Sequence, residues 1–361
     1  MRYTKWMKGS AYTGRLPTGC RHCARGGKLV LLVTGICESG CYYCPLSEKK
    51  RGKAVVYADE LLSKSDSDII GEAKLIDATG TGLTGGDPLI LPKETARLIR
   101  LLKGEFGSKH HIHLYTSSSD LRAIRAVAKA GLDEIRFHPP VSSWDRMEGS
   151  RYETALLSAV DLGMEVGLEI PSLPGSEAAI RSLVGSASKM SLSFVNLNEL
   201  EFSETNWRQL KSRGFEVKDD VSAAVKGSER LALKILAGSE SGIPLHYCSS
   251  SFKDAIQLRR RIMRRARNVK RPFDVLTKDG TRLIGIIETN KSIAVVSDLH
   301  DRLAVPRNMM EANAGMCRIE IAPWILEEIF SEVEGRSFII EEYPTADRLE
   351  VEREPLAVKR R

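Results

Sequence analysis

The chain has 361 residues, 42% of them hydrophobic and 28% charged, and this is enough to bury one large core and a smaller appended one. No run of eighteen apolar residues occurs, and no apolar segment of signal-peptide length follows the amino terminus, so we expect a cytoplasmic protein without a membrane partner. The seven cysteines are odd in number and clustered, which favours metal ligands over disulfides. The formal net charge of +7 is a weak indication of an anionic partner.

From residue 28 to residue 205, apolar runs alternate with helical patterns. Short runs rich in β-branched residues predict strands, and apolar residues that recur every three or four positions predict amphipathic helices. The predicted strands are 28–35, 75–86, 111–119, 134–140, 165–175 and 193–202. Six strand-helix units favour a parallel sheet that is two units short of a closed barrel. We therefore expect an α/β fold with a partial (β/α)6 barrel and functional groups at the carboxyl ends of its strands.

The pattern changes after residue 205. A helix with nine basic residues between Lys253 and Arg271 is followed by a predicted hairpin that turns at Asp279-Gly280, by further short strands and by one helix near 323–333. This predicts a small carboxyl-terminal β-rich domain. The expected parts are an amino-terminal segment 1–27 with a metal knuckle, a barrel 28–250, a basic helical linker 251–272 and the β-rich domain 273–361.

Three cysteines stand within eight residues directly behind the first predicted strand: Cys37, Cys41 and Cys44. Three thiolates at this spacing can hold three corners of a cubic [4Fe–4S] cluster and leave its fourth iron without a protein ligand. A structural zinc ion is the alternative, but a closed zinc site requires four ligands. The spacing therefore favours a cluster with an open iron.

An aromatic residue, Tyr43, precedes the last of these cysteines, and Thr84-Gly85-Gly86-Asp87-Pro88 follows about forty residues later at a predicted strand end. In both features the chain resembles the radical S-adenosylmethionine (SAM) superfamily. Over roughly residues 20–270 it resembles an archaeal-type branch related to the pyruvate formate-lyase activating enzyme. The resemblance implies an enzyme that reductively cleaves SAM at a [4Fe–4S] cluster to generate a 5′-deoxyadenosyl radical. It also implies an electron donor such as ferredoxin or flavodoxin.

The same resemblance implies which side chains bind SAM. Glycine lets the backbone approach the methionyl amine because no Cβ stands in the way. The implied cofactor-binding residues are Tyr43, Gly85, Gly86, Asp87, Pro88, Ser117 and Glu169. Structural alternatives remain for three of them: Tyr43 can pack in its loop, Ser117 can belong to a helix cap, and Glu169 can be a paired strand carboxylate.

A second group of cysteines has no counterpart in these motifs. Cys20-x2-Cys23 is followed by glycines, as in a metal knuckle, and Cys248 lies near the end of the predicted barrel. With His22 or His246 the three thiolates complete a zinc site, and alone they can hold a second iron–sulfur cluster. Unligated buried thiols are the third alternative.

The substrate is open between RNA or tRNA and a protein. The basic helix, with Arg259, Arg260, Arg264 and Arg265 as candidate phosphate contacts, favours RNA modification, although a solvated helix explains the same charge. The family resemblance favours an activase that abstracts hydrogen from a partner protein. A zinc-stabilised RNA-binding protein is the non-enzymatic alternative. The sequence makes no prediction of oligomeric state.

Overall fold

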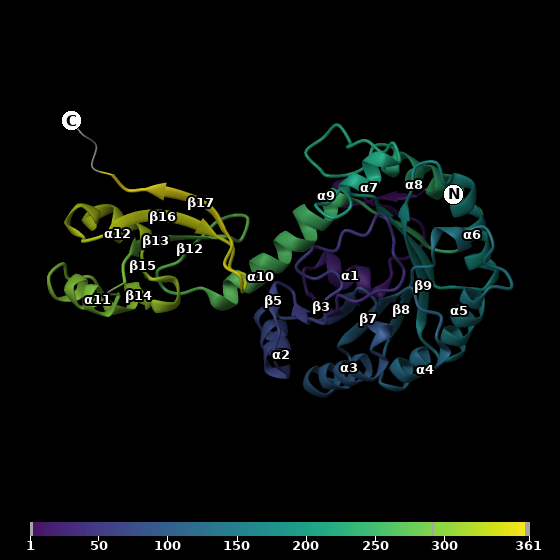
Figure 1. Cartoon of the computed structure of the whole chain (residues 1–361), viewed down its shortest axis with the longest axis horizontal. Coiled ribbons are helices and arrows are strands. Elements are labelled where there is room, and N and C mark those ends of the chain that lie inside the picture. The colour runs from purple at the N-terminus through teal and green to yellow at the C-terminus, as the bar shows by residue number, and fades with distance from the viewer. Residues whose placement is uncertain (1–2, 291, 358–361) are drawn as a thin grey trace. The chain divides into compact units, whose positions relative to one another are not determined.

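The computed structural model describes residues 3–290 and 292–357. The chain forms two compact units, Met1–Leu258 and Arg259–Arg361 (Figure 1). The division falls inside the segment 251–272. Among the described helices, none is long and apolar enough to cross a membrane.

The first unit is built on a curved sheet in which, among the described strands, seven run parallel in the order β11-β10-β9-β8-β7-β6-β3. These strands are β3 Lys28–Thr34, β6 Gly80–Gly85, β7 His111–Thr116, β8 Glu134–Phe137, β9 Glu165–Ser172, β10 Phe194–Glu199 and β11 Leu245–Cys248. Each of the six predicted strands is present, and β11 adds a seventh that the sequence pattern did not predict. The partial α/β barrel is confirmed.

Helices cover the outer face of this sheet (Figure 1). They are α2 Asp66–Leu75, α3 Pro92–Phe106, α4 Leu121–Lys129, α5 Arg151–Asp161, α6 Glu177–Lys189 and α8 Ser228–Ala237. Helix α7 Trp207–Ser212 instead lies at the carboxyl ends of the strands, where its Gln209 lines a cavity. Helix α3 illustrates why they form: Pro92 occupies the first turn, where its missing N–H is no loss, and Leu98, Ile99 and Leu102 are fully buried on one face. The Asp120 side chain caps α4 by accepting from the backbone N–H groups of its first turn.

A short helix, α1 Thr18–Ala24, lies inside the curve of the sheet (Figure 1). It packs tightly against β7 and β8, since a Cβ on Gly19 would lie 2.7 Å from His113 Nδ1 and 2.8 Å from Arg136 Nη2. The amino-terminal strands β1 Thr4–Lys5 and β2 Ala11–Tyr12 extend the sheet beside β11 in antiparallel fashion. At the other edge, β4 Tyr57–Ala58 and β5 Leu61–Leu62 follow β3.

The second unit begins with the basic helix α10 Arg259–Val269 and contains an antiparallel sheet of order β14-β15-β13-β16-β17, to which β12 adds beside β13. Its strands are β12 Val275–Leu276, β13 Arg282–Glu288, β14 Met310–Asn313, β15 Arg318–Ile321, β16 Arg336–Glu342 and β17 Glu350–Pro355. The predicted hairpin, the β-rich character and the helix near 323–333 (α12 Pro323–Ile329) are confirmed. Helix α11 Ser292–Asp301 was not predicted.

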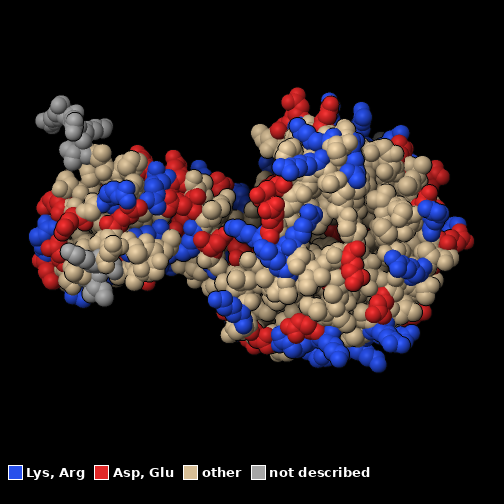
Figure 2. Space-filling view, in the orientation of Figure 1, with Lys and Arg blue, Asp and Glu red and all other residues tan. Residues whose placement is uncertain are grey.

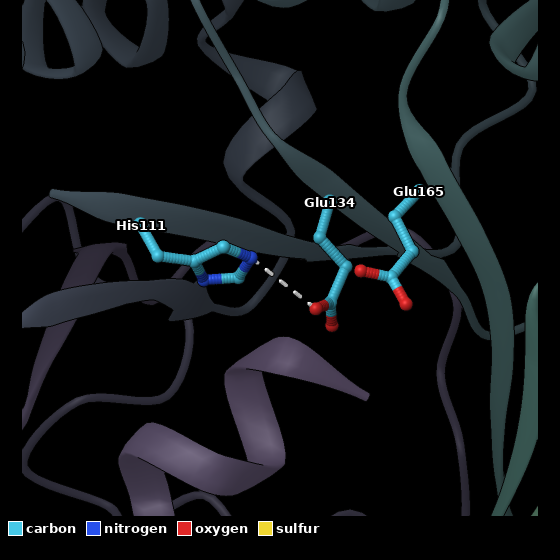
Figure 3. A group of neighbouring side chains, drawn as sticks. All are labelled: His111, Glu134 and Glu165. Atoms are coloured by element: carbon cyan, nitrogen blue, oxygen red, sulfur yellow. Dashed lines mark ion pairs between the residues drawn. The ribbon is translucent and has the colours of Figure 1, made fainter. Parts of the chain in front are cut away.

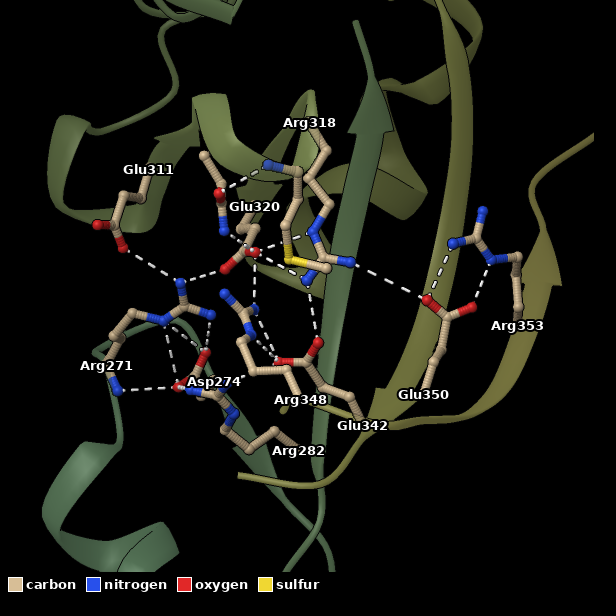
Figure 4. Close-up of polar contacts among 12 residues, drawn as sticks. Arg271, Asp274, Arg282, Glu311, Arg318, Glu320, Glu342, Arg348, Glu350 and Arg353 are labelled. Atoms are coloured by element: carbon tan, nitrogen blue, oxygen red, sulfur yellow. Dashed lines mark hydrogen bonds and ion pairs between the residues drawn. The ribbon is translucent and has the colours of Figure 1, made fainter. Parts of the chain in front are cut away.

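A network of buried ion pairs ties the strands of this second sheet together (Figure 4). Glu320 and Glu342 are fully buried, and Arg318 bridges them at 2.8 and 2.9 Å. Arg348 contacts both carboxylates at 2.7 Å, and Arg282 contacts Glu342 at 2.6 Å. Buried charges are tolerated only when paired in this way, so the network specifies how β13, β15 and β16 pack.

Candidate active site

The loop after β3 carries Cys37, Cys41 and Cys44 at the carboxyl ends of the parallel strands. Cys37 is exposed and the other two are half-buried, and all three are free thiols. Together they line a cavity of about 820 Å³. The cavity therefore has three thiols on one wall, where the sequence placed a cluster-binding loop.

Gly85 and Gly86, at the end of β6, bring a second strand end against this loop. A Cβ on Gly85, whose φ is +149°, would lie 2.2 Å from Thr34 O, and a Cβ on Gly86 would lie 2.0 Å from Ile36 O. The Gly86 N–H donates to Thr34 O at 2.7 Å, and the Asp87 N–H donates to Ile36 O at 2.9 Å. Only glycine allows this approach, so the pair fastens the start of the cysteine loop while also lining the cavity.

Asp87 and Pro88 lie behind the cavity wall rather than in it. Both are buried, and neither lines the cavity. The Asp87 carboxylate caps a short helix by accepting from Leu89 N–H and also accepts from Thr116 Oγ1 at 2.7 Å and from Ser117 N–H at 2.9 Å. Protein donors thus occupy the Asp87 carboxylate. It does not face the cavity, so this geometry does not support the expected direct contact between Asp87 and SAM. Its geometry is that of a support for Ser117.

Ser117 lies at the end of β7 and lines the cavity. Its hydroxyl hydrogen-bonds Asp87 Oδ2 at 3.0 Å and also contacts the hydroxyl of Ser39 in the cysteine loop. The cap of α4 is supplied by Asp120, so Ser117 is not a helix cap. The serine therefore joins the strand end to the loop and keeps a polar face in the cavity.

Tyr43, His138 and Glu169 form a chain of hydrogen bonds across the cavity. His138 Nδ1–H donates a hydrogen bond to the backbone carbonyl of Glu169 at 2.7 Å. In this neutral tautomer Nε2 carries no hydrogen, so it accepts a hydrogen bond from the Tyr43 hydroxyl, 2.9 Å away. Burial lowers the pKa of His138, which favours this neutral form. Tyr43 itself is buried and lines the cavity, so its ring is held in place against the cysteine loop.

The Glu169 side chain is held ionised despite its burial. Burial raises its pKa, but the Arg136 guanidinium at 2.6 Å and the side-chain amides of Asn196 and Asn198, each at 2.9 Å, outweigh this and lower the pKa to about 2. Glu169 is thus a paired strand carboxylate that also lines the cavity, and its contact with SAM stays a prediction.

Several residues that support the cysteine loop had no signal in the sequence. Asn206, fully buried, donates from Nδ2 to Tyr43 O at 3.0 Å, and Thr205 Oγ1 donates to Cys44 O at 3.3 Å. Arg51 also donates to Cys44 O, at 3.0 Å. Their roles are backbone contacts between distant segments, which no local motif reports.

Cys20, Cys23 and Cys248, distant in sequence, line one smaller cavity of about 180 Å³ inside the sheet. His246 lines it too, with Nδ1 at 3.6 Å from Cys20 Sγ, whereas His22 bonds Thr79 outside this cavity. The structure thus brings the second cysteine group together.

Another group of possible ligands lies at the amino-terminal ends of three central strands, away from the cysteine loop (Figure 3). His111, Glu134 and Glu165 are the first residues of β7, β8 and β9, and their ligand atoms lie within 4.8 Å of one another. Glu134 already pairs with the buried Arg136, and Glu165 lies 3.7 Å from an Arg15 nitrogen. The positive charges of Arg136 and Arg15 disfavour the binding of a metal cation to this group. Glu134 also accepts from the Gly19 N–H at 2.9 Å, so the group anchors α1.

The four arginines proposed for RNA binding lie on α10. Arg265 is buried and donates to the Pro344 carbonyl. Arg259 pairs with Asp279 at 2.9 Å. Arg260 and Arg264 also have interaction partners. On the drawn face of the second unit, basic and acidic side chains are interspersed (Figure 2).

Comparison with protein families identifies the class to which this fold and site belong. Residues 31–175 match the family described as Radical SAM superfamily, and residues 280–356 match one described as Domain of unknown function (DUF8061). The chain belongs to the radical SAM superfamily and is an enzyme of that class, as the cysteine and glycine motifs predicted. A protein of Methanocaldococcus jannaschii named "Putative glycyl-radical enzyme activating enzyme" is 40% identical, over 96% of this chain and 94% of its own length.

Solved structures match this chain at low identity and with TM-scores below 0.5. The crystal structure of Streptococcus suis SuiB matches with a TM-score of 0.43 and 13% identity, over 62% of this chain and 49% of SuiB. The hydrogenase maturase HydG of Carboxydothermus hydrogenoformans matches with a TM-score of 0.40 and 15% identity, over 58% and 51% of the two chains. The chain spans about half the length of these two proteins, and a likeness at this level says nothing of substrate or reaction.

Radical SAM enzymes use a [4Fe–4S] cluster and SAM, and the residues of the larger cavity fit both groups. Three thiols line it, and among its described lining residues His138 is the one imidazole, with both nitrogens already hydrogen-bonded. A cluster held by the three thiolates would therefore keep one iron free of protein nitrogen. The volume of about 820 Å³ lies within the range of small-molecule sites.

Proposed function

We propose that this chain is an activating enzyme that removes a hydrogen atom from a glycine of a partner protein. The observation that carries the proposal is the 40% identity, over nearly the full length of both chains, to a protein named for that activity. If bound, the cluster and SAM would supply a 5′-deoxyadenosyl radical able to take a hydrogen atom, since one electron passed from the reduced cluster to SAM breaks the sulfur–C5′ bond and releases methionine. This chain's own residues bind the two cofactors and the substrate.

In this proposal Cys37, Cys41 and Cys44 hold the cluster. Gly85 and Gly86 line the cavity beside the methionyl end of SAM, because without a Cβ they can lie directly against the start of the cysteine loop. Asp87 and Pro88 act indirectly: they lie behind the cavity wall, where Asp87 positions Ser117 at the end of β7.

Three further residues shape the rest of the cavity. Ser117 presents a hydroxyl for the ribose, and Tyr43 presents its ring for the adenine, fixed by its bond to His138. Glu169, kept ionised by Arg136, offers a carboxylate that hydroxyl or amine groups of SAM can approach.

Polar side chains of the cavity support a protein substrate. Glu201, Gln209, Arg213 and Lys253 line it, and their side chains include both donors and acceptors. Such groups can hydrogen-bond a peptide backbone. A glycine in an extended loop approaches closely because it has no side chain. RNA has less support, because Arg265 is buried and Arg259 is ion-paired.

A deuterium-transfer experiment tests the proposal even while the partner protein is unidentified. A protein fraction from cells grown on α-deuterated glycine is incubated anaerobically with the dithionite-reduced enzyme and SAM. We expect 5′-deoxyadenosine heavier by one mass unit, in a fraction that also gains a protein-based radical by electron paramagnetic resonance. The Cys41→Ala variant is the control and should form neither.

The molecule from which the deuterium in 5′-deoxyadenosine comes decides whether glycine is the substrate. Deuterium that comes instead from RNA or from small molecules of the same cells would refute a glycine substrate. Label that appears equally from cells fed α-deuterated alanine would refute it as well. Either result would leave the radical SAM class untouched and would redirect the search for the substrate.

A further inference from the structure

The smaller cavity collects four potential metal ligands from two distant segments. Cys20 and Cys23 lie three residues apart on α1 and so share one helix face. Cys248 and His246 lie on β11, which reaches the same place because it pairs with β10 and β2. All four side chains are buried and line the cavity of about 180 Å³.

Two buried polar atoms in this cavity have no protein partner. His246 is 2% exposed, and its Nε2 has no hydrogen-bond partner among the described residues. The same holds for Asn196 Oδ1. An unpaired polar atom at such depth costs free energy, so the arrangement indicates a missing ligand.

The sulfur of Cys20 is surrounded by donors. Arg136 Nη2 and Asn196 Nδ2 each lie 3.4 Å from it. Hydrogen bonds of this kind stabilise thiolate rather than thiol, and they tune metal-bound sulfur in iron–sulfur sites.

The spacing of the four ligands discriminates between one ion and a cluster. Two ligands of a single zinc ion cannot lie further apart than about 4.6 Å, twice the Zn–S bond. Among the described residues, no three of Cys20, Cys23, Cys248 and His246 have ligand atoms all within 4.8 Å of one another. The same is true of the Cys37, Cys41 and Cys44 thiols, which fit a cluster. The spacing of the three thiols therefore favours a cluster here too, and His246, whose Nδ1 lies 3.6 Å from Cys20 Sγ, would reach that cluster through its unpartnered Nε2.

Size and charge agree with a cluster. A cavity of about 150 Å³ can hold a benzene molecule, a group of six heavy atoms, so about 180 Å³ accommodates a compact inorganic core. Lys28 lines the cavity, and the described structure gives its ammonium the Tyr115 hydroxyl at 3.5 Å but no carboxylate within 4.0 Å. A dicationic [4Fe–4S] core with three thiolates carries one net negative charge, which Lys28 would balance.

We propose that Cys20, Cys23 and Cys248 hold a second iron–sulfur cluster, with His246 as the neighbouring fourth ligand. This goes beyond the proposed activase function and does not depend on it. The cluster's cavity shares Tyr115, Glu169, Asn198 and Lys253 with the larger cavity. Arg136 and Asn196 each contact both Cys20 Sγ and Glu169 Oε2, so one hydrogen-bonded layer separates the two sites.

The test removes the first cluster and asks what iron remains. The full chain with Cys37, Cys41 and Cys44 all changed to Ala is purified anaerobically and reconstituted with iron and sulfide. We expect about four irons and about four sulfides per chain, with a reduced electron paramagnetic resonance signal that SAM does not alter. Adding Cys20→Ser or Cys248→Ser should abolish both. Cys317→Ser, at an exposed cysteine of the second unit, is the matched control and should change nothing.

Several results would overturn the proposal. A triple variant that melts like the unmodified chain but holds no sulfide would do so, as would a single zinc ion lost on Cys20→Ser. If the triple variant does not fold, Cys248→Ser in the otherwise unmodified chain should lower iron from about eight to about four per chain. An unchanged iron content there would refute the second cluster. None of these measurements involves SAM or a partner protein, so they are independent of the activase test.

Discussion

Replacement of Glu169 by glutamine tests the buried charge that joins the two cavities. The three groups that contact this carboxylate, Arg136 Nη1, Asn196 Nδ2 and Asn198 Nδ2, are all donors. Glutamine has one carbonyl oxygen and one amide nitrogen, so at least one donor would face another donor. Glu169→Gln also leaves the buried Arg136 with Glu134 as its remaining carboxylate.

The size of the effect follows from the pKa of Glu169. It falls from 4.5 to about 2, and at about 1.4 kcal/mol per unit this corresponds to about 3 kcal/mol in favour of the folded, ionised form. Loss of one partner from a buried ion pair typically costs about 3–5 kcal/mol, which agrees. For a unit of this size such a loss lowers the melting temperature by roughly 6–12 °C.

Thermal unfolding of the full chain at pH 7, followed by circular dichroism, measures the effect. The control is Glu177→Gln, at a half-buried surface glutamate of α6 that pairs with Arg181 and Lys234, because it shows the cost of losing a surface ion pair. Because the folded-state pKa of Glu169 is depressed, its contribution is present above about pH 4.5 and is lost as the pH falls towards 2. The difference between the unmodified chain and Glu169→Gln should therefore shrink over that range. A shift at pH 7 no larger than that of Glu177→Gln, or a difference that does not change with pH, would refute this reasoning.

Three other predictions concern separate parts of the chain. Gly86→Ala places a Cβ 2.0 Å from Ile36 O and should lower the yield of 5′-deoxyadenosine about 100-fold, whereas Gly104→Ala, with nothing within 4 Å, should not. Tyr43→Phe removes the bond to His138 and should weaken SAM binding about fivefold by calorimetry, equivalent to about 1 kcal/mol; an unchanged affinity would exclude a role for that bond. The pKa of Glu320 is raised by burial but lowered overall to about 2 by Arg348 and Arg271, so hydrogen-exchange protection of the second unit should fall as pH drops from about 4.5 towards 2 and be constant above it.

The barrel strands could be predicted because each carries its own signal. Runs such as 28–35 are apolar and β-branched and are separated by helical periodicity, so local pattern and final fold agree. Strand β11 escaped prediction because it has four residues, Leu245–Cys248, and its burial comes from its neighbours β10 and β2. Helix α11 escaped for a different reason, since Ser292–Asp301 carries the β-branched residues typical of a strand.

In the site, too, local sequence patterns could be predicted, whereas contacts between residues distant in sequence could not. The spacing of Cys37, Cys41 and Cys44 is local, and the structure places them on one cavity wall. The direction of the Asp87 carboxylate depends on Thr116 and Ser117, about thirty residues away, and so could not be predicted. Asn206 supports the loop through a backbone carbonyl, a contact that leaves no pattern in the sequence.

The central claim is that the larger cavity performs radical SAM chemistry on the Cys37, Cys41 and Cys44 loop. The most direct measurement is 5′-deoxyadenosine released from SAM by the reconstituted, dithionite-reduced chain, compared with Cys41→Ala prepared in the same way. We expect release by the unmodified chain and none by the variant, whose circular dichroism should show that it is folded. Equal release by both proteins, or none by a chain that holds its full complement of iron and sulfide, would contradict the claim.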